Sequence, residues 1–337
     1  MTVDTSQVSS PAAGLSYGAA SMRSPWIGFV LRRVARLLVS LWVLVTASFF
    51  MIHLIPGDPV RAALGKYASA ELVQAQRHSL GLDAPLAVQY LHHLRDLASG
   101  DFGTSIASSL PVSQIITQRM PATAEIALLS FALIVAVAVP VGVVMAALTH
   151  GGRHGGTQLA FTSSSVLLAV IPDFLFAVGL VYLFAVELKW LPIAGKSDWR
   201  SYVLPVVSLS LGATAVLCRI VRVEMVSVLG EDYIRTARAK RLRARAVYFR
   251  HALPNALTAT LTFGGMLLTG LLAGTVLIEN VFVWPGLGTV IVSSIQQNDY
   301  PVVQALIVVY GGMVLVVNLV VDLLLAVLDP RSTIRGS

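Results

Sequence analysis

The sequence predicts an all-α membrane protein with six transmembrane helices, and three observations lead to this prediction. Hydrophobic residues make up 56% of the 337 residues and charged residues only 12%, whereas soluble globular proteins contain about 25% charged residues. The mean hydropathy is +0.77, so lipid rather than a soluble core must cover the apolar surface. Six apolar segments each reach the roughly 20 residues that a transmembrane helix needs. Disorder of the whole chain, a collagen-like chain and a disulfide scaffold are excluded, the last because Cys218 is the only cysteine.

The six predicted spans follow one another through loops of unequal length. They are residues 37–55, 122–148, 158–186, 202–221, 256–279 and 302–328. The third and the sixth are longer than a bilayer requires, so we expect tilt or extension beyond the bilayer.

Residues 1–25 form a predicted disordered tail, and residues 26–337 form the predicted transmembrane domain. The tail is rich in Ser, Ala and Gly and has no apolar periodicity. It does not read as the start of a signal peptide, because it carries Asp4 and its first basic residue is Arg23. We therefore interpret the first apolar segment as a retained membrane anchor.

Basic residues are distributed unequally between the two sides of these spans. Sixteen of the 24 Lys and Arg residues fall on the side of the two termini, nine of them in the loop 219–255. The positive-inside rule assigns this side to the cytoplasm. Six crossings then place both termini in the cytoplasm.

The loop 56–120, on the outer side, is too long for a bare connection and is predicted to form a structured cap. Residues 70–80 and 85–98 have helical patterns. Pro85 suits the start of the second helix, and Gly100 follows its end.

Several kinds of catalytic or metal chemistry lack their motifs. A phosphate-binding loop needs a glycine five residues before Gly195-Lys196-Ser197, and Trp190 occupies that position. No H-E-x-x-H or G-x-S-x-G sequence is present. His92 and His93 are adjacent, so a helix would direct them to different faces, and a surface helix is favoured over a metal site. We expect no cofactor in this chain.

The loop 219–255 carries the most information about function. A short helix is predicted from Tyr233 to Lys240, with Glu231 and Asp232 at its start, where acidic side chains suit the helix dipole. Charge alone would also fit a basic juxtamembrane segment that contacts anionic lipid.

The order of residues in this loop resembles the EAA loop of bacterial ABC importer permeases. That motif has Glu-Ala-Ala, a Gly six residues after the Glu, and a later Leu-Pro. Ala237, Leu253 and Pro254 match it, whereas Arg235 and Thr236 replace the Glu and the first Ala, and Arg241 replaces the Gly. The variants DYIRTARAK (232–240) and RHALPNAL (250–257) are similar to the peptide/nickel subfamily, in particular its first, B-type, subunit.

The resemblance extends over nearly the whole chain from residue 28. Matching segments occur in the order expected for that subfamily: PGDPV (56–60), LGLDAPLAVQY (80–90), GDFGTSI (100–106), IPDFLFAVGL (171–180), WLPIAG (190–195), ENVFVWPGLG (279–288), NDYPVVQALIVV (298–309) and NLVVDLLLAVLDPR (318–331).

This resemblance implies a type I ABC importer permease fold in the bacterial inner membrane. It implies three kinds of protein partner: a second homologous permease that shares the translocation path, two ATPase subunits that bind ATP and Mg, and an extracytoplasmic substrate-binding protein. It also implies contact with membrane lipid and no binding of nucleic acid. It makes 222–255 the coupling loop, with coupling residues Glu231, Asp232, Tyr233, Arg235, Thr236, Ala237, Lys240, Arg241, Leu253 and Pro254. It makes Glu279, Trp284, Pro285 and Gly286 an outer turn near the docked binding protein.

Arg241 departs from the family at a position where glycine would permit a positive φ. We predict that an Arg241→Gly change is tolerated.

Acidic residues at membrane depth are costly and often functional. Glu125, Glu279 and Asp322 lie near predicted helix ends, where helix-end contacts are expected. Asp173 follows Pro172 near the middle of the third span, where the subfamily more often has a small residue. One hypothesis is that Asp173 faces the translocation path and attracts a cationic group. The alternative is a buried acid paired with the partner permease.

The predicted cargo is a di- or oligopeptide, because the subfamily is mostly peptide-directed. Nickel, glutathione, haem or an opine-like solute remain alternatives, since the binding protein sets much of the selectivity. Two rivals come from other classes. An integral membrane hydrolase would need paired catalytic groups at one depth, which the sequence does not offer, and a channel or scaffold would not need the coupling signature.

Overall fold

The computed structural model describes residues 25–54, 58–65, 67–79, 81–152 and 154–328. Regular structure in these ranges is helical, apart from an isolated β-bridge between Thr104 and Pro111. The predicted tail lies outside the described residues except for Pro25, where the first helix begins.

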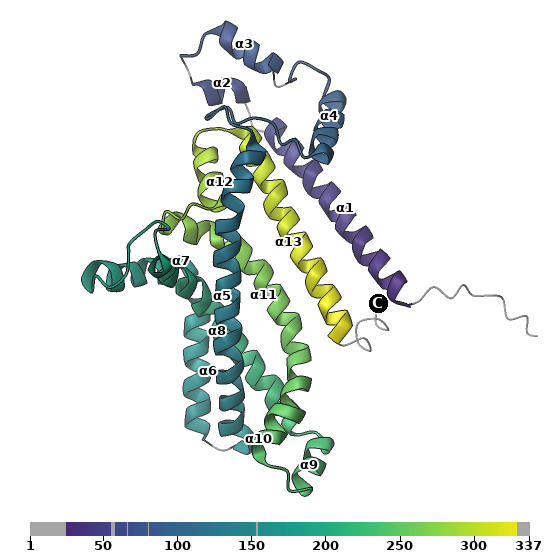
Figure 1. The fold of residues 1–337 in the computed structure, drawn as a ribbon, viewed down its shortest axis with the longest axis vertical. Coiled ribbons are helices and arrows are strands. Elements are labelled where there is room, and N and C mark those ends of the chain that lie inside the picture. Colours follow the sequence, from purple (N-terminus) through teal and green to yellow (C-terminus); the bar gives the residue numbers. More distant parts are fainter. Residues whose placement is uncertain (1–24, 55–57, 66, 80, 153, 329–337) are drawn as a thin grey trace, which may run out of the picture.

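The long helices form an elongated bundle; α2, α3 and α4 lie at one end and α9 and α10 at the other, while α6 and α7 lie beside α8 (Figure 1). The long helices are α1 (Pro25–Leu54), α5 (Val112–Thr149), α8 (Val203–Leu229), α11 (Leu253–Val281) and α13 (Tyr300–Leu328). The shorter ones are α2 (Pro59–Leu64), α3 (Ala70–Ser79), α4 (Leu86–Ser99), α6 (Gly155–Val170), α7 (Asp173–Leu180), α9 (Asp232–Ala239), α10 (Ala244–Ala246) and α12 (Leu287–Gln296), with the π-helical turns η2 (Val181–Glu187) and η4 (Val247–Ala252) and the 3₁₀ turns η1 (His150–Gly152) and η3 (Trp199–Tyr202).

Five helices of the described chain are long and apolar enough to cross a membrane, and a sixth crossing results if α6 and α7 with η2 form one span. The third predicted span is therefore broken rather than continuous, with its two parts at 92°. The physical reason is Pro172, which lacks an N–H and forces Ile171 out of the helical region, to φ −70° and ψ 123°.

The centre of the bundle is the pair α5 and α8. Gly142 on α5 allows the close approach, because a Cβ there would lie 2.6 Å from the Cβ of Val221 on α8. Cys218, one turn before Val221, is buried in the same interface. Large apolar side chains remain exposed along α1, α6 and α7, as expected for helices that face lipid or another subunit.

The cap lies at one end of the bundle, beside α12, and α9 lies at the opposite end (Figure 1). The two cap helices predicted over 70–80 and 85–98 are confirmed as α3 and α4, while α2 was not predicted. Gly100 ends α4 in the left-handed conformation, with φ 79°.

The cap is anchored to the start of α13 by Asp299, which is buried. Its carboxylate accepts hydrogen bonds from Ser105 Oγ (2.5 Å), Ile106 N (3.0 Å) and Ala107 N (3.3 Å). Tyr90 on α4 also shares a hydrogen bond of 2.7 Å with Thr46 on α1. The cap is thus held on both α1 and α13.

Candidate functional site: a coupling loop and an outer turn

The predicted coupling loop contains a short amphipathic helix, α9. Ile234 and Ala237 are buried against the chain, and α9 packs on η4. The other predicted coupling residues of α9 face outward: Glu231, Asp232, Tyr233, Arg235, Thr236 and Lys240 are exposed. The helix therefore presents a polar face that no described residue covers.

The end of α9 explains the departure at Arg241. Leu242 N donates to Ala237 O (3.4 Å) and Arg241 N donates to Arg238 O (2.9 Å), which is the hydrogen-bond pattern of a Schellman motif. This motif places Arg241 in the left-handed region, with φ 53°. Arg241 thus adopts the conformation that glycine would favour at the matching position.

The loop returns to the membrane through Leu253 and Pro254, which begin α11. Proline is suited to the first turn of a helix because its missing N–H has no intrahelical partner there. Burial and the nearby Glu231 raise the pKa of Tyr233, and an interaction with Asn255 lowers it in part. Because α9 packs on η4, which ends at Ala252 directly before Leu253, the two halves of the predicted motif lie close together.

The outer turn is built around Glu279, whose side chain is fully buried at the end of α11. One carboxylate oxygen accepts hydrogen bonds from Gly288 N (2.6 Å) and Thr289 N (3.4 Å), in the first turn of α12. Gly286 lies so close to this carboxylate that a Cβ would collide with it. The carboxylate of Glu279 thus caps the start of α12. Gly286 and Gly288 are required beside it because a side chain at either position would collide with this carboxylate.

Trp284 attaches this turn to the bundle. Its side chain is fully buried, its Nε1 donates to Ala122 O (3.1 Å), and its ring meets Tyr202 edge-on with centroids 4.7 Å apart. Pro285 follows and is partly exposed.

A second set of residues beside the outer turn was not predicted as a unit. Glu125 accepts from Lys196 Nζ (2.5 Å) and from the Tyr202 hydroxyl (2.7 Å). The hydrogen bond to Glu125 raises the pKa of Lys196. Gly195 N donates to Phe282 O (2.8 Å). We name Glu125, Lys196 and Tyr202 the outer clamp; the only sequence signal was the matching segment WLPIAG directly before Lys196.

Most of the acidic residues that were predicted at membrane depth form a hydrogen bond or an ion pair within the chain. Glu125 contacts Lys196 and Tyr202 in the outer clamp, and Glu279 accepts hydrogen bonds from the backbone of α12. Asp322 on α13 forms an ion pair of 2.7 Å with Arg33 on α1. Asp173 differs: it is half-buried at the start of α7, and no donor or charged group of the described chain faces its carboxylate.

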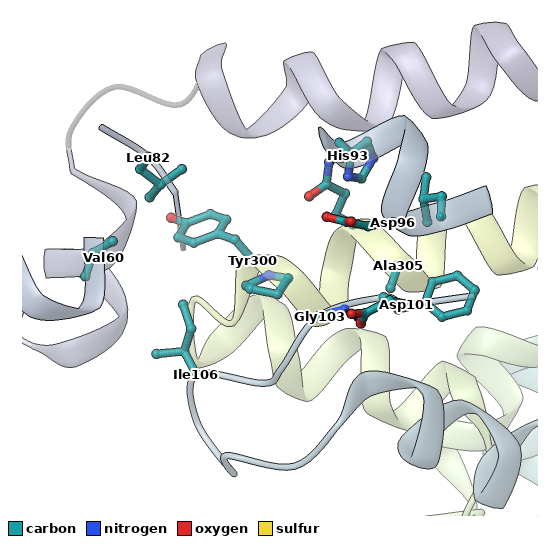
Figure 2. Close-up of a pocket in the computed structure, with 13 residues that line it drawn as sticks. Val60, Leu82, His93, Asp96, Asp101, Gly103, Ile106, Tyr300 and Ala305 are labelled. Carbon is teal, nitrogen blue, oxygen red and sulfur yellow. Dashed lines mark hydrogen bonds between the residues drawn. The ribbon is translucent and has the colours of Figure 1, made fainter. Parts of the chain in front are cut away.

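One of the pockets at the cap end has a volume of about 190 Å³ and lies between the cap and α13. Figure 2 shows His93 and Asp96 on α4 opposite Tyr300 and Ala305. In the described part of the chain, no group of three or more His, Cys, Asp or Glu residues could hold a metal ion.

Comparison with protein families decides the class of the protein. The model of the binding-protein-dependent transport system inner membrane component matches residues 138–334, and the model of the N-terminal part of such components matches residues 26–127. The chain belongs to this family. This permease is therefore a multi-pass inner-membrane protein of the ABC transporter class and a transport subunit, with ATP bound by a partner ATPase.

Curated relatives match this permease over almost their full length. The glutathione transport system permease protein GsiC of Pectobacterium atrosepticum is 38% identical over 305 residues, which cover 90% of this chain and 98% of the relative. The GsiC of Escherichia coli K12 is 35% identical over 304 residues with the same coverage.

Solved structures support the fold of the permease. Inward-facing structures of the MetNI methionine ABC transporter contain a chain with a TM-score of 0.55 and 17% identity, which covers 64% of this chain and 97% of the other. This similarity confirms the predicted ABC importer permease fold and says nothing about cargo.

Proposed function

We propose that this permease forms half of the translocation path of an importer for glutathione or a closely related tripeptide. The observation that carries the proposal is the similarity of 35–38% to glutathione permeases over 98% of their length. This similarity supports glutathione, which the sequence analysis gave as an alternative cargo, over the general di- and oligopeptide cargo that it favoured. The complex would contain a second permease, two ATPase subunits with ATP and Mg, and a substrate-binding protein.

The proposal assigns α9 to the contact with an ATPase subunit. Its exposed polar face, backed by buried Ile234 and Ala237, suits insertion into a cleft of a soluble partner. The exposed ion pair between Asp232 and Arg235 (3.1 Å) lies on this face. The position of α9 at the end opposite the cap agrees with an ATPase on one side of the membrane and a binding protein on the other (Figure 1).

The proposed orientation places α9 in the cytoplasm and the cap outside. It rests on the excess of Lys and Arg on the α9 side of the spans. Both termini would then be cytoplasmic, although residues 1–24 and 329–337 lie outside the described chain.

The cargo is tested by uptake of labelled glutathione into proteoliposomes that contain the complete importer and ATP. Accumulation that excess S-methylglutathione suppresses, and that nickel, haem or an unrelated dipeptide does not, is the expected result. Accumulation of the dipeptide without glutathione would return the cargo to the general peptide class and overturn this assignment.

The coupling role is tested in the same vesicles with Tyr233→Ala, because Tyr233 is 44% exposed on α9. Loss of an interface tyrosine is expected to lower ATP-driven uptake by about tenfold or more. The matched control is Tyr67→Ala, at a fully exposed tyrosine of the cap. Equal uptake by the two variants would remove α9 from the ATPase contact.

A further inference from the structure

The break between α6 and α7 leaves a backbone acceptor without its helical donor. In a continuous helix, the carbonyl of Leu168 would accept from the N–H of residue 172, four positions later. Residue 172 is proline and has no N–H. The Leu168 carbonyl therefore lacks its helical partner, at the end of α6 where the helix dipole is negative.

The Asp173 carboxylate is directed to the same place. A Cβ built on Gly212 of α8 would lie 3.3 Å from Asp173 Oδ1 and 3.6 Å from the Leu168 carbonyl oxygen. A Cβ on Gly274 of α11 would lie 3.8 Å from Asp173 Oδ2. Two acceptor oxygens thus converge beside Gly212, and Gly274 flanks them.

The polar backbone groups at a helix break cannot face lipid at membrane depth. Irregular backbone in a spanning segment is stable only where protein buries it or where it lines a water-filled cavity. In this chain Ile171 and Pro172 are exposed, and no described donor faces Asp173. Broken helices with free carbonyls are also a feature of cation-binding positions in transporters.

We propose that Asp173 and the Leu168 carbonyl form a seat for the primary ammonium group of the cargo as it passes through the translocation path. The seat offers acceptors and a negative charge, and an ammonium group offers three donors and a positive charge. A glutathione-like tripeptide carries one such group. The inference rests on the proposed function for the identity of the cargo, and on the geometry alone for the preference for a cation.

The first test measures uptake in proteoliposomes of the complete importer. Asp173→Asn and Gly212→Ala are expected to lower uptake of S-methylglutathione by about tenfold or more, because one removes the charge and the other fills the seat. Asp173→Glu keeps the charge and is expected to retain most of the uptake. Gly179→Ala on α7 is the matched control, since a Cβ there meets nothing within 4 Å.

Basal ATP hydrolysis, measured without cargo, checks that each variant assembles. If the wild type takes up neither glutathione nor S-methylglutathione, the proposed cargo fails and the seat is judged by the second test. If the wild type is active and Asp173→Asn equals it, or if Asp173→Glu is as impaired as Asp173→Asn, the ammonium seat is overturned.

The second test needs no cargo. Ile171→Cys, at an exposed position two residues before Asp173 that leaves the carboxylate in place, is introduced together with Cys218→Ser, which removes the only native cysteine of this chain, and the purified complex is treated with two methanethiosulfonate reagents. One carries a trimethylammonium group and the other a sulfonate group. Relative to their rates with a free thiol, the ammonium reagent is expected to react faster at residue 171, and Asp173→Asn is expected to remove most of this preference.

The same labelling at Gly179→Cys provides the matched position on α7. No reaction at residue 171 would show that the break is covered by protein and does not line a water-filled path. A faster reaction of the sulfonate reagent would show that the break attracts anions. Either result overturns the proposal.

Discussion

Arg241 shows how one residue can depart from a motif while keeping its geometry. Its φ of 53° is in the left-handed region, which costs a non-glycine residue about 1 kcal/mol or slightly more. The Schellman hydrogen bonds of Leu242 and Arg241 to the end of α9 hold this conformation. At this position of the predicted coupling loop, Arg241 thus adopts the left-handed conformation that glycine would favour.

Arg241→Gly is therefore expected to raise the free energy of unfolding by up to about 1 kcal/mol, because glycine adopts this φ without strain. Uptake is expected to stay near the wild-type rate. Thermal unfolding of the purified complex and uptake measure the two effects. A complete loss of transport at unchanged stability would show that the Arg241 side chain itself acts in coupling.

At Gly288 in the outer turn, a substitution is expected to destabilise the protein. A Cβ there would lie 2.6 Å from the backbone Cα of Val276 and 2.8 Å from Glu279 Oε2, so α11 and α12 would have to separate. Gly288→Ala is expected to cost about 1–3 kcal/mol and to lower the yield of assembled importer. Gly270→Ala on the adjacent helix α11, where a Cβ meets nothing within 4 Å, is the control for a glycine change that causes no collision. Equal melting temperatures of the two variants would contradict the close packing.

At the scale of elements, we predict that the attachment of the cap depends on pH. His93 on α4 is half-buried, and its Nε2 lies 3.2 Å from the Gln304 amide on α13. Burial lowers the pKa of His93, and the nearby Asp96 offsets part of this effect. The folded cap favours the neutral form of His93. The contribution of neutral His93 to the stability of the docked cap is therefore fully present above the ordinary pKa of histidine, and it is lost as the pH falls through the lowered pKa of the folded state.

The docking of α4 is therefore expected to weaken when the outer pH falls from 7.5 to about 5. Hydrogen exchange of the α4 backbone amides measures this change. The other titratable groups around this contact are His53, His92, Asp96, Asp101, Tyr90 and Tyr300. His93→Gln is expected to remove most of the pH dependence and His92→Gln, on an exposed neighbour, to leave it. A pH dependence that survives His93→Gln would assign it to another of these groups.

The elements themselves were largely predictable, because apolar length sets spans and glycine and proline set ends. Five spans and the cap helices α3 and α4 follow from such local signals. Pro172 signalled a kink, but the 92° bend depends on how α7 packs across α8 and α11, which no local pattern reports. The outer clamp was not predictable, because Glu125 and Lys196 are 71 residues apart and meet only through the tertiary fold.

At the scale of the whole molecule, the outer clamp connects four parts of the chain. Glu125 comes from α5, Lys196 from the loop before η3, and Tyr202 from η3, while Gly195 holds the same loop to the outer turn. Lys196 also lies 5.7 Å from the ring centroids of Tyr202 and Trp284. This charged contact thus adds to the contacts of Trp284 that join α5 and η3 to the outer turn.

Reversing this contact tests its role. Lys196→Glu alone is expected to lower the melting temperature of the complex, since it faces Glu125 with a like charge, and Glu125→Lys alone to do the same. The double variant is expected to recover part of the loss, because the opposite charges are restored. Additive losses in the double variant would show that the contact contributes packing and not charge.

The buried position of Cys218 has a consequence for redox chemistry. A cargo with a free thiol can exchange with any accessible cysteine and remain attached as a mixed disulfide. Cys218 is the only sulfhydryl group in the sequence, and it is 5% exposed, within the interface of α5 and α8. For the thiol tripeptide proposed as cargo, the surface of this permease therefore offers no sulfur on which a passing molecule would become covalently trapped, in its reduced or its oxidised form.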